Sequence, residues 1–157
     1  MTTRQSKDTF TRPADTTAYA AADLVANSTT AGNAVPLKFG IGGGGFAIRA
    51  FHLEKTDETD VANADFTVRF YTEEPTPANG DNGALSTDYS GYIGSIDLGA
   101  MTAYTDVAAV EAQNQGIFGY ANTKGELWAL IEANAAYIPA SGEIFLATVT
   151  VEKAAHA

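Results

Sequence analysis

The sequence has no cysteine, and it has only two histidines and one tryptophan among its 157 residues. Without cysteine there is no disulfide and no thiolate chemistry, although this absence does not fix a redox compartment. The two histidines, His52 and His156, stand far apart, so a two-histidine metal centre is not expected. No serine lies in a Gly-x-Ser-x-Gly context. We therefore predict no catalytic residue, no metal site, no cofactor and no enzyme activity.

The sequence also lacks long apolar runs. None approaches the roughly 20 residues needed to cross a bilayer, and the N-terminus has no apolar segment of the signal-peptide type. Hydrophobic residues nevertheless make up 45% of the chain, which is ordinary for a packed protein. We expect a soluble protein with no membrane partner, made in the cytoplasm, with one core that buries roughly 70% of the unfolded surface.

Charge is distributed unevenly along the chain. The first twelve residues hold three basic residues and one acidic residue, a net charge of +2, whereas the rest holds six basic and eighteen acidic residues, a net charge of −12. An acidic body argues against nucleic acid as a partner, because phosphate binding needs a basic surface. The polar leader is too poor in apolar residues to fold alone. We predict a flexible basic arm at residues 1–12, either frayed or docked on an acidic neighbour, and a single β-sandwich domain at residues 13–153.

Alternation of apolar and polar residues is typical of half-buried strands. Phe66, Val68 and Phe70, for example, fall on one face of an extended segment. By this pattern, strands are expected at residues 18–27, 35–39, 46–55, 64–73, 91–99, 117–121, 127–133 and 143–152. The strands at 46–55 and 64–73 look like a long hairpin or a Greek-key pair. The last two flank Pro139-Ala140-Ser141-Gly142, which predicts two strands joined by a tight connection.

Three loop segments invite functional interpretations. Residues 40–45 are almost all glycine but do not end in Gly-Lys-Ser/Thr, so a flexible connection or a bulge at a corner is favoured over a nucleotide loop. Asp57, Glu58 and Asp60 lack the spacing of a calcium loop, which favours a solvated acidic connector. The turn at residues 75–83 carries one carboxylate, Asp81, and its Asn-Gly pairs favour positive φ rather than calcium binding.

The pattern changes at residues 105–113. This stretch is rich in helix formers, and Thr105 could serve as an N-cap, so a short helix or an irregular excursion is expected there. The remaining segments give about eight strands separated by turn clusters. The predicted fold class is therefore all-β, an antiparallel β-sandwich or a jelly-roll-like fold.

Three blocks of the sequence carry a resemblance to a known family. They are residues 10–30, residues 75–83 and residues 136–145, and together they span most of the chain. In this order they resemble a family of small tailed-bacteriophage structural proteins, the head decoration or capsid cement-like proteins. The resemblance implies a virion component that binds the outer surface of a phage head and stabilises it. It transfers no functional residue, because the matching positions look like strand and turn framework.

A decoration protein must grip several capsid subunits, and symmetric sites favour a closed homo-oligomer, with a trimer suited to threefold positions. The expected partners are the major capsid protein and other copies of this chain, on the capsid surface of the virion. We expect the basic arm to make the contact, through Arg4, Lys7, Phe10 and Arg12.

Two other functions remain open from the sequence. One is a carbohydrate-binding β-sandwich module with a stacking platform such as Trp128, although the apolar neighbours of Trp128 favour core packing. The other is a tail or baseplate structural subunit, which the sequence does not separate from a capsid protein. Arg49, Arg69 and Glu132 lie within strand patterns and either pair with one another or face an interface.

Overall fold

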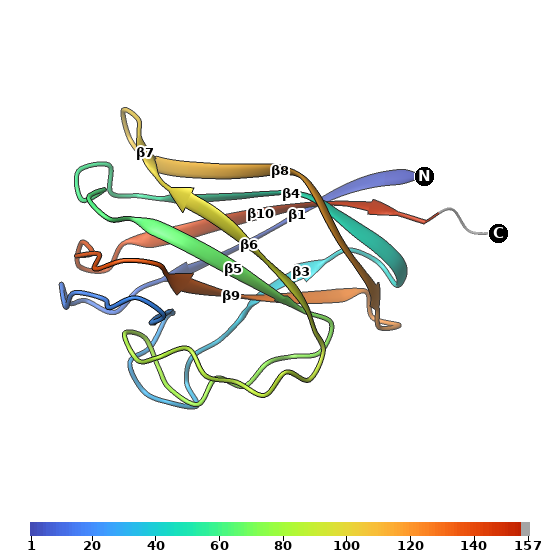
Figure 1. Ribbon diagram of the computed structural model, residues 1–157, viewed down its shortest axis with the longest axis horizontal. Helices are drawn as coiled ribbons and strands as arrows, with labels where there is room; N and C mark the ends of the chain where they lie inside the picture. Colours follow the sequence, from blue (N-terminus) through green and yellow to red (C-terminus); the bar gives the residue numbers. More distant parts are fainter. Residues whose placement is uncertain (155–157) are drawn as a thin grey trace.

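The computed structural model of the protein describes residues 1–154 (Figure 1). His156, the second of the two histidines, lies outside these residues. The described residues form ten β-strands. In chain order these are β1 (Thr2–Thr11), β2 (Leu24–Val25), β3 (Leu37–Gly40), β4 (Gly44–Lys55), β5 (Asp65–Tyr71), β6 (Tyr92–Ala100), β7 (Thr102–Ala103), β8 (Ala108–Ala121), β9 (Glu126–Ala133) and β10 (Ile144–Lys153). Within this part of the chain no helix is long and apolar enough to span a membrane.

The strands form two antiparallel sheets. Sheet 1 has the order β1-β10-β4-β8-β7, and sheet 2 has the order β2-β9-β5-β6, with β3 also paired to β9. In Figure 1 the long strands of sheet 1 cross the upper part of the molecule, and β5, β6 and β9 lie below them. The predicted all-β antiparallel sandwich is confirmed.

Alternate side chains of both sheets meet in one hydrophobic core. On β10, Phe145, Ala147 and Val149 point inward and are fully buried, while Leu146 and Thr148 between them are partly exposed. Aromatic rings link the layers: Phe51 of sheet 1 meets Phe70 of sheet 2 edge-on at a centroid distance of 5.4 Å, and Phe66 meets Phe145 at 5.6 Å. Such pairs add to the stabilisation that burial itself provides.

The sheet pairings differ from two of the sequence-based expectations. β9 and β10 lie in different sheets, so the segment around Pro139 crosses between the layers rather than closing a hairpin. In the same way β4 pairs with β8 and β10, whereas β5 pairs with β6 and β9, so these two strands are not a hairpin. The β4–β5 and β9–β10 connections therefore each carry the chain from one sheet to the other, across the core.

The short helix expected at residues 105–113 is wrong, and the other expectation, an irregular excursion, holds only for residues 105–107. Residues from Ala108 onward belong to β8, which pairs with β4 from Lys55↔Ala108 to Gly44↔Ala121 with one register shift. Val110 and Ala112 pack against the core, while Glu111 and Gln113 are exposed. Pairing with a long neighbouring strand therefore overrides a local composition that favours helix.

The segment predicted as a flexible arm, residues 1–12, also differs. Residues Thr2–Thr11 form the edge strand β1, which pairs with all ten residues of β10. The expected first strand at residues 18–27 is reduced to Leu24–Val25. The glycine-rich segment is the corner between β3 and β4, as predicted, and Gly42 and Gly44 have φ of 80° and 91° there.

Candidate functional site

A buried ion pair fixes the point where β1 enters the body of the protein. The Arg12 and Asp81 side chains have no exposed surface, and Arg12 Nη2 donates a hydrogen bond to Asp81 Oδ2 at 2.9 Å. The Tyr19 hydroxyl accepts a hydrogen bond from Arg12 Nε and donates one to Asp81 Oδ1 at 2.6 Å. Burial raises the pKa of Tyr19 above its ordinary value, so its hydroxyl stays protonated and remains a donor.

This pair changes the interpretation of two predicted residues. Arg12, proposed from the sequence to contact a partner, is instead committed to the interior of its own chain. Asp81, considered as a calcium ligand, has its carboxylate occupied by Arg12, Tyr19 and the backbone N–H of Ala26, which lies at 2.8 Å. The cluster is structural, because nothing outside the protein reaches it.

A second buried polar group lies beside the first. Lys55 Nζ contacts Glu143 Oε2 at 3.2 Å, with both side chains fully buried, and the Tyr137 hydroxyl donates to Glu143. Tyr137 stacks on Tyr19 at a centroid distance of 5.7 Å, which joins the two groups. Together they tie the chain near Arg12 to the connection that precedes β10.

The acidic connector after β4 folds on itself. Asp57 accepts hydrogen bonds from the backbone N–H of Asp60 and from the hydroxyl of Thr59, both at 2.9 Å. Burial alone would raise the pKa of Asp57, but these hydrogen bonds and the nearby Lys55 outweigh it and lower the pKa to about 2. Across residues 1–154, no group of three or more acidic, histidine or cysteine side chains is placed to hold a metal ion.

The other predicted contact residues lie on β1 with different orientations. Lys7 is exposed and is opposite Thr148, whose neighbours on β10 point into the core, so Lys7 belongs to the outer face of sheet 1. Arg4 is exposed at the sheet edge, over Gly42. Phe10 is partly buried and stacks on Phe145 at 5.3 Å, so it anchors β1 to the core.

The outer face of sheet 2 is covered by loops of the same chain. A second apolar cluster there contains Trp128, Leu130 and Tyr71, and Ala34 and Leu85 from two long loops pack against it. Trp128 is only 5% exposed, which confirms that it packs in the interior. The hypothesis that Trp128 forms a stacking platform for a sugar is therefore wrong. Figure 1 shows these loops gathered beneath β9. Arg69 pairs across this sheet with Glu132, Nε to Oε2, at 2.8 Å.

The outer face of sheet 1, in contrast, is open. Its side chains come from alternate positions of β1, β10, β4 and β8, and most are small, polar or charged, including the exposed ion pair of Arg49 with Glu152. Two large aromatic residues stand out near one end: Phe118 is 69% exposed and Tyr120 is 76% exposed. They lie opposite Ala47 and Gly45 of β4, and because alanine has only a methyl group and glycine has no side chain, both rings project from the sheet. We call Phe118 and Tyr120 the aromatic pair.

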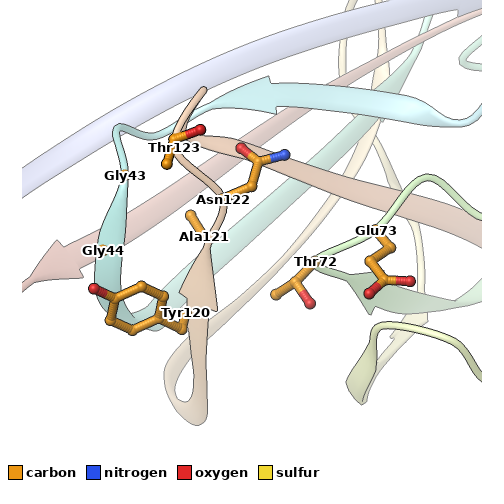
Figure 2. A pocket seen from close by; sticks show the side chains of 8 residues that line it. All are labelled: Gly43, Gly44, Thr72, Glu73, Tyr120, Ala121, Asn122 and Thr123. Carbon is orange, nitrogen blue, oxygen red and sulfur yellow. The ribbon is translucent and has the colours of Figure 1, made fainter.

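Hollows lie on both sides of the aromatic pair. On the side of Phe118, a mainly apolar hollow of about 390 Å³ is lined by Met1, Phe46, Ala47 and Ala154 among others. On the side of Tyr120, a groove of about 640 Å³ with both polar and apolar lining is formed by Gly43, Gly44, Thr72, Glu73, Tyr120, Ala121, Asn122 and Thr123. Figure 2 shows the Tyr120 ring at one end of this groove and the Glu73 carboxylate at the other.

Comparison with known proteins gives no family. No family model and no curated protein matches the chain. Among solved structures, the chain is similar to the tobacco streak virus coat protein, with 12% identity over 96% of this chain and 88% of that one and a TM-score of 0.29. It is also similar to the SPBc2 prophage-derived protein YomS, with 14% identity over 97% and 98% and a TM-score of 0.25. A marine algae virus of the order Picornavirales gives 10% identity over 96% and 67% and a TM-score of 0.25. At such TM-scores these similarities do not bear on function.

Sequence reasoning did not find the aromatic pair. Phe118 and Tyr120 alternate with Ile117 and Gly119, a pattern that predicts a strand with one apolar face and does not say which face is covered. The available signal was the glycine and alanine opposite them on β4, but the pairing of β4 with β8 was not predicted. The exposed surface therefore emerges only from the fold.

Proposed function

We propose that this protein is a virion structural protein that decorates the outer surface of a bacteriophage head, and that it binds the shell through the outer face of sheet 1. The resemblance of the three sequence blocks to head decoration proteins suggests the class. The unequal covering of the two sheets carries the choice of surface: loops bury the outer face of sheet 2, whereas sheet 1 presents the aromatic pair to solvent.

The aromatic pair has the character of an interface anchor. Aromatic residues are enriched in protein interfaces, and a few of them carry most of the binding energy when they enter a pocket on the partner. Phe118 and Tyr120 project from a rigid sheet, so little conformational entropy is lost when they are buried. In this proposal the major capsid protein supplies the pocket.

The N-terminal strand contributes to the same surface in a more limited way than the sequence suggested. Lys7 lies on the outer face of sheet 1 and is free to contact a neighbour, whereas Arg4 is opposite the core-facing Val151 and lies over Gly42, away from this face. Phe10 and Arg12 support this contact from inside by holding β1 in place. A closed homo-oligomer, with a trimer favoured, would present several copies of the face to symmetric sites on the shell.

Binding to purified heads that lack the protein tests the proposal. Removing one anchor residue costs about 2 kcal/mol or more, so Phe118→Ser with Tyr120→Ser should weaken binding at least about thirtyfold. Tyr89→Ser is the matched control, because Tyr89 is 69% exposed but belongs to the loops over sheet 2. Circular dichroism confirms folding of each variant. Undiminished occupancy by the double variant contradicts the proposed surface.

The groove of Figure 2 supports a second candidate function, saccharide binding. An exposed tyrosine at one end and a carboxylate at the other provide a stacking surface and a hydrogen-bond acceptor, the groups that sugar rings and hydroxyls need. Glycan-array binding lost in Tyr120→Ala and retained in Phe118→Ser would favour this function. If the protein binds no glycan on the array, saccharide binding is ruled out and capsid binding is the remaining proposal.

A further inference from the structure

Strand β1 is held to the molecule mainly along one edge. All ten of its residues pair with β10. On its other edge, the side chains of Ser6 and Asp8 accept hydrogen bonds from the backbone N–H groups of Gly40 and Lys38, at 3.0 and 2.8 Å. Beside the C-terminal half of β1, a groove of about 420 Å³ lies between the strand and residues 27 and 35–37. Side chains, rather than a second strand ladder, cover this edge.

The composition of β1 gives it little share in the core. Phe10 is its only hydrophobic residue, and most of its side chains are exposed. An element that buries little apolar surface opens at a lower free energy than the core strands. Opening β1 therefore leaves the sandwich intact and exposes the β10 edge together with the surface of Phe145 that Phe10 covers.

The chain on the C-terminal side of β1 provides a fixed pivot. Arg12 is locked by its buried ion pair, and its backbone N–H donates to Glu143 O at 2.9 Å. No short turn links β1 to its partner, because Thr11 lies opposite Ile144. Movement of β1 about Thr11 consequently strains no hairpin.

We propose that β1 is an exchangeable strand, which leaves the β10 edge of its own chain and pairs with β10 of a second copy. The receiving edge is the same sequence in both copies, so the exchanged arrangement reproduces every β1 contact of the closed form. Such exchange links copies without requiring a new surface. It deepens the homo-oligomer included in the proposed function and gives its N-terminal segment a defined partner, the β10 edge of another copy.

Introduced cysteines test this cleanly, because the natural chain has none. Lys7 and Thr148 are register partners on the outer face of sheet 1. One protein carries Lys7→Cys and a second carries Thr148→Cys, and the two are mixed at high concentration, incubated and treated with a short bismaleimide. Exchange brings the two cysteines together on different chains. A covalent heterodimer is then expected, and its yield should rise with incubation time.

A matched pair from the middle of the same sheet controls for random collision. His52 of β4 and Thr148 of β10 are also register partners on this face, and each of these two strands is paired on both sides, β10 with β1 and β4, and β4 with β10 and β8. His52→Cys mixed with Thr148→Cys should give only background heterodimer. A single chain with both Lys7→Cys and Thr148→Cys, cross-linked in dilute solution, shows that the two positions react when they are opposite each other.

The outcomes separate clearly. Heterodimer from the Lys7 and Thr148 mixture well above the control mixture supports exchange. A yield no higher than the control, while the doubly substituted chain cross-links internally, overturns it. Gln5→Cys and Thr150→Cys, a second register pair, should give the same result. No capsid is present, so failure of head binding and failure of strand exchange are distinguishable.

Discussion

Replacing Asp81 with asparagine tests whether the buried polar cluster holds the N-terminal strand and the turn at residues 75–83 in place. The Asp81 carboxylate accepts hydrogen bonds from Arg12, Tyr19 and the backbone of Ala26, and all three groups are donors. Asparagine keeps the size of the side chain but removes its charge. It also brings an amide nitrogen, a fourth donor, into a site where donors already converge.

The magnitude follows from the burial of both charges. Removing one member of a fully buried ion pair costs about 3–5 kcal/mol, because the other charge stays buried without compensation. In a chain of this length, a loss of 1 kcal/mol lowers Tm by about 2–4 °C. Asp81→Asn should therefore lower Tm by roughly 6–20 °C. The loss of about 3–5 kcal/mol is a large share of the free energy of unfolding of an ordinary domain.

Thermal and urea unfolding, followed by circular dichroism and by the fluorescence of the buried Trp128, measure this loss. The double variant Arg12→Met with Asp81→Leu removes both charges and should recover most of the stability. Arg49→Gln, which breaks an exposed pair with Glu152, is the control and should leave the midpoint unchanged. A free energy of unfolding for Asp81→Asn within about 1 kcal/mol of that of the natural protein would refute the assigned role of the cluster.

Two further predictions concern loops. Gly80→Ala should destabilise the fold by about 1–3 kcal/mol, because an added Cβ would lie 2.4 Å from the backbone of Thr29, whereas Gly40→Ala faces open space and should be silent in the same thermal melts. Asp57, with its pKa lowered to about 2, contributes stability that is complete above about pH 4 and is lost as the pH falls toward 2. In Asp57→Asn, the midpoint of urea unfolding should therefore depend less on pH across that range than it does in the natural protein. An unchanged dependence of the midpoint on pH would contradict the assignment.

Periodicity predicted the parts of the fold whose signal is local. The alternation in residues 64–73 and 143–152 predicted β5 and β10, and the strand expected at residues 127–133 is β9. The glycines at residues 40–45 predicted a corner. These features depend on neighbours a few residues away, so the sequence contains them directly.

The features that periodicity missed depend on distant partners. β1 is polar and basic, which is also typical of a disordered leader, and its order comes from β10 at the other end of the chain. β8 contains helix formers, and β4 imposes the strand. Arg12 and Asp81 are 69 positions apart, and no local pattern joins them. The candidate contact surface needed all of these pairings before the open face of sheet 1 could be identified.

A cryo-EM reconstruction of the phage head to which we propose the protein binds tests the central claim most directly. The proposal predicts sandwich-shaped density outside the shell at local symmetry axes, with the outer face of sheet 1 and its aromatic pair against the capsid subunits and the loops over sheet 2 facing solvent. A bare shell, density confined to the tail, or a decoration bound through the loops over sheet 2 would contradict it.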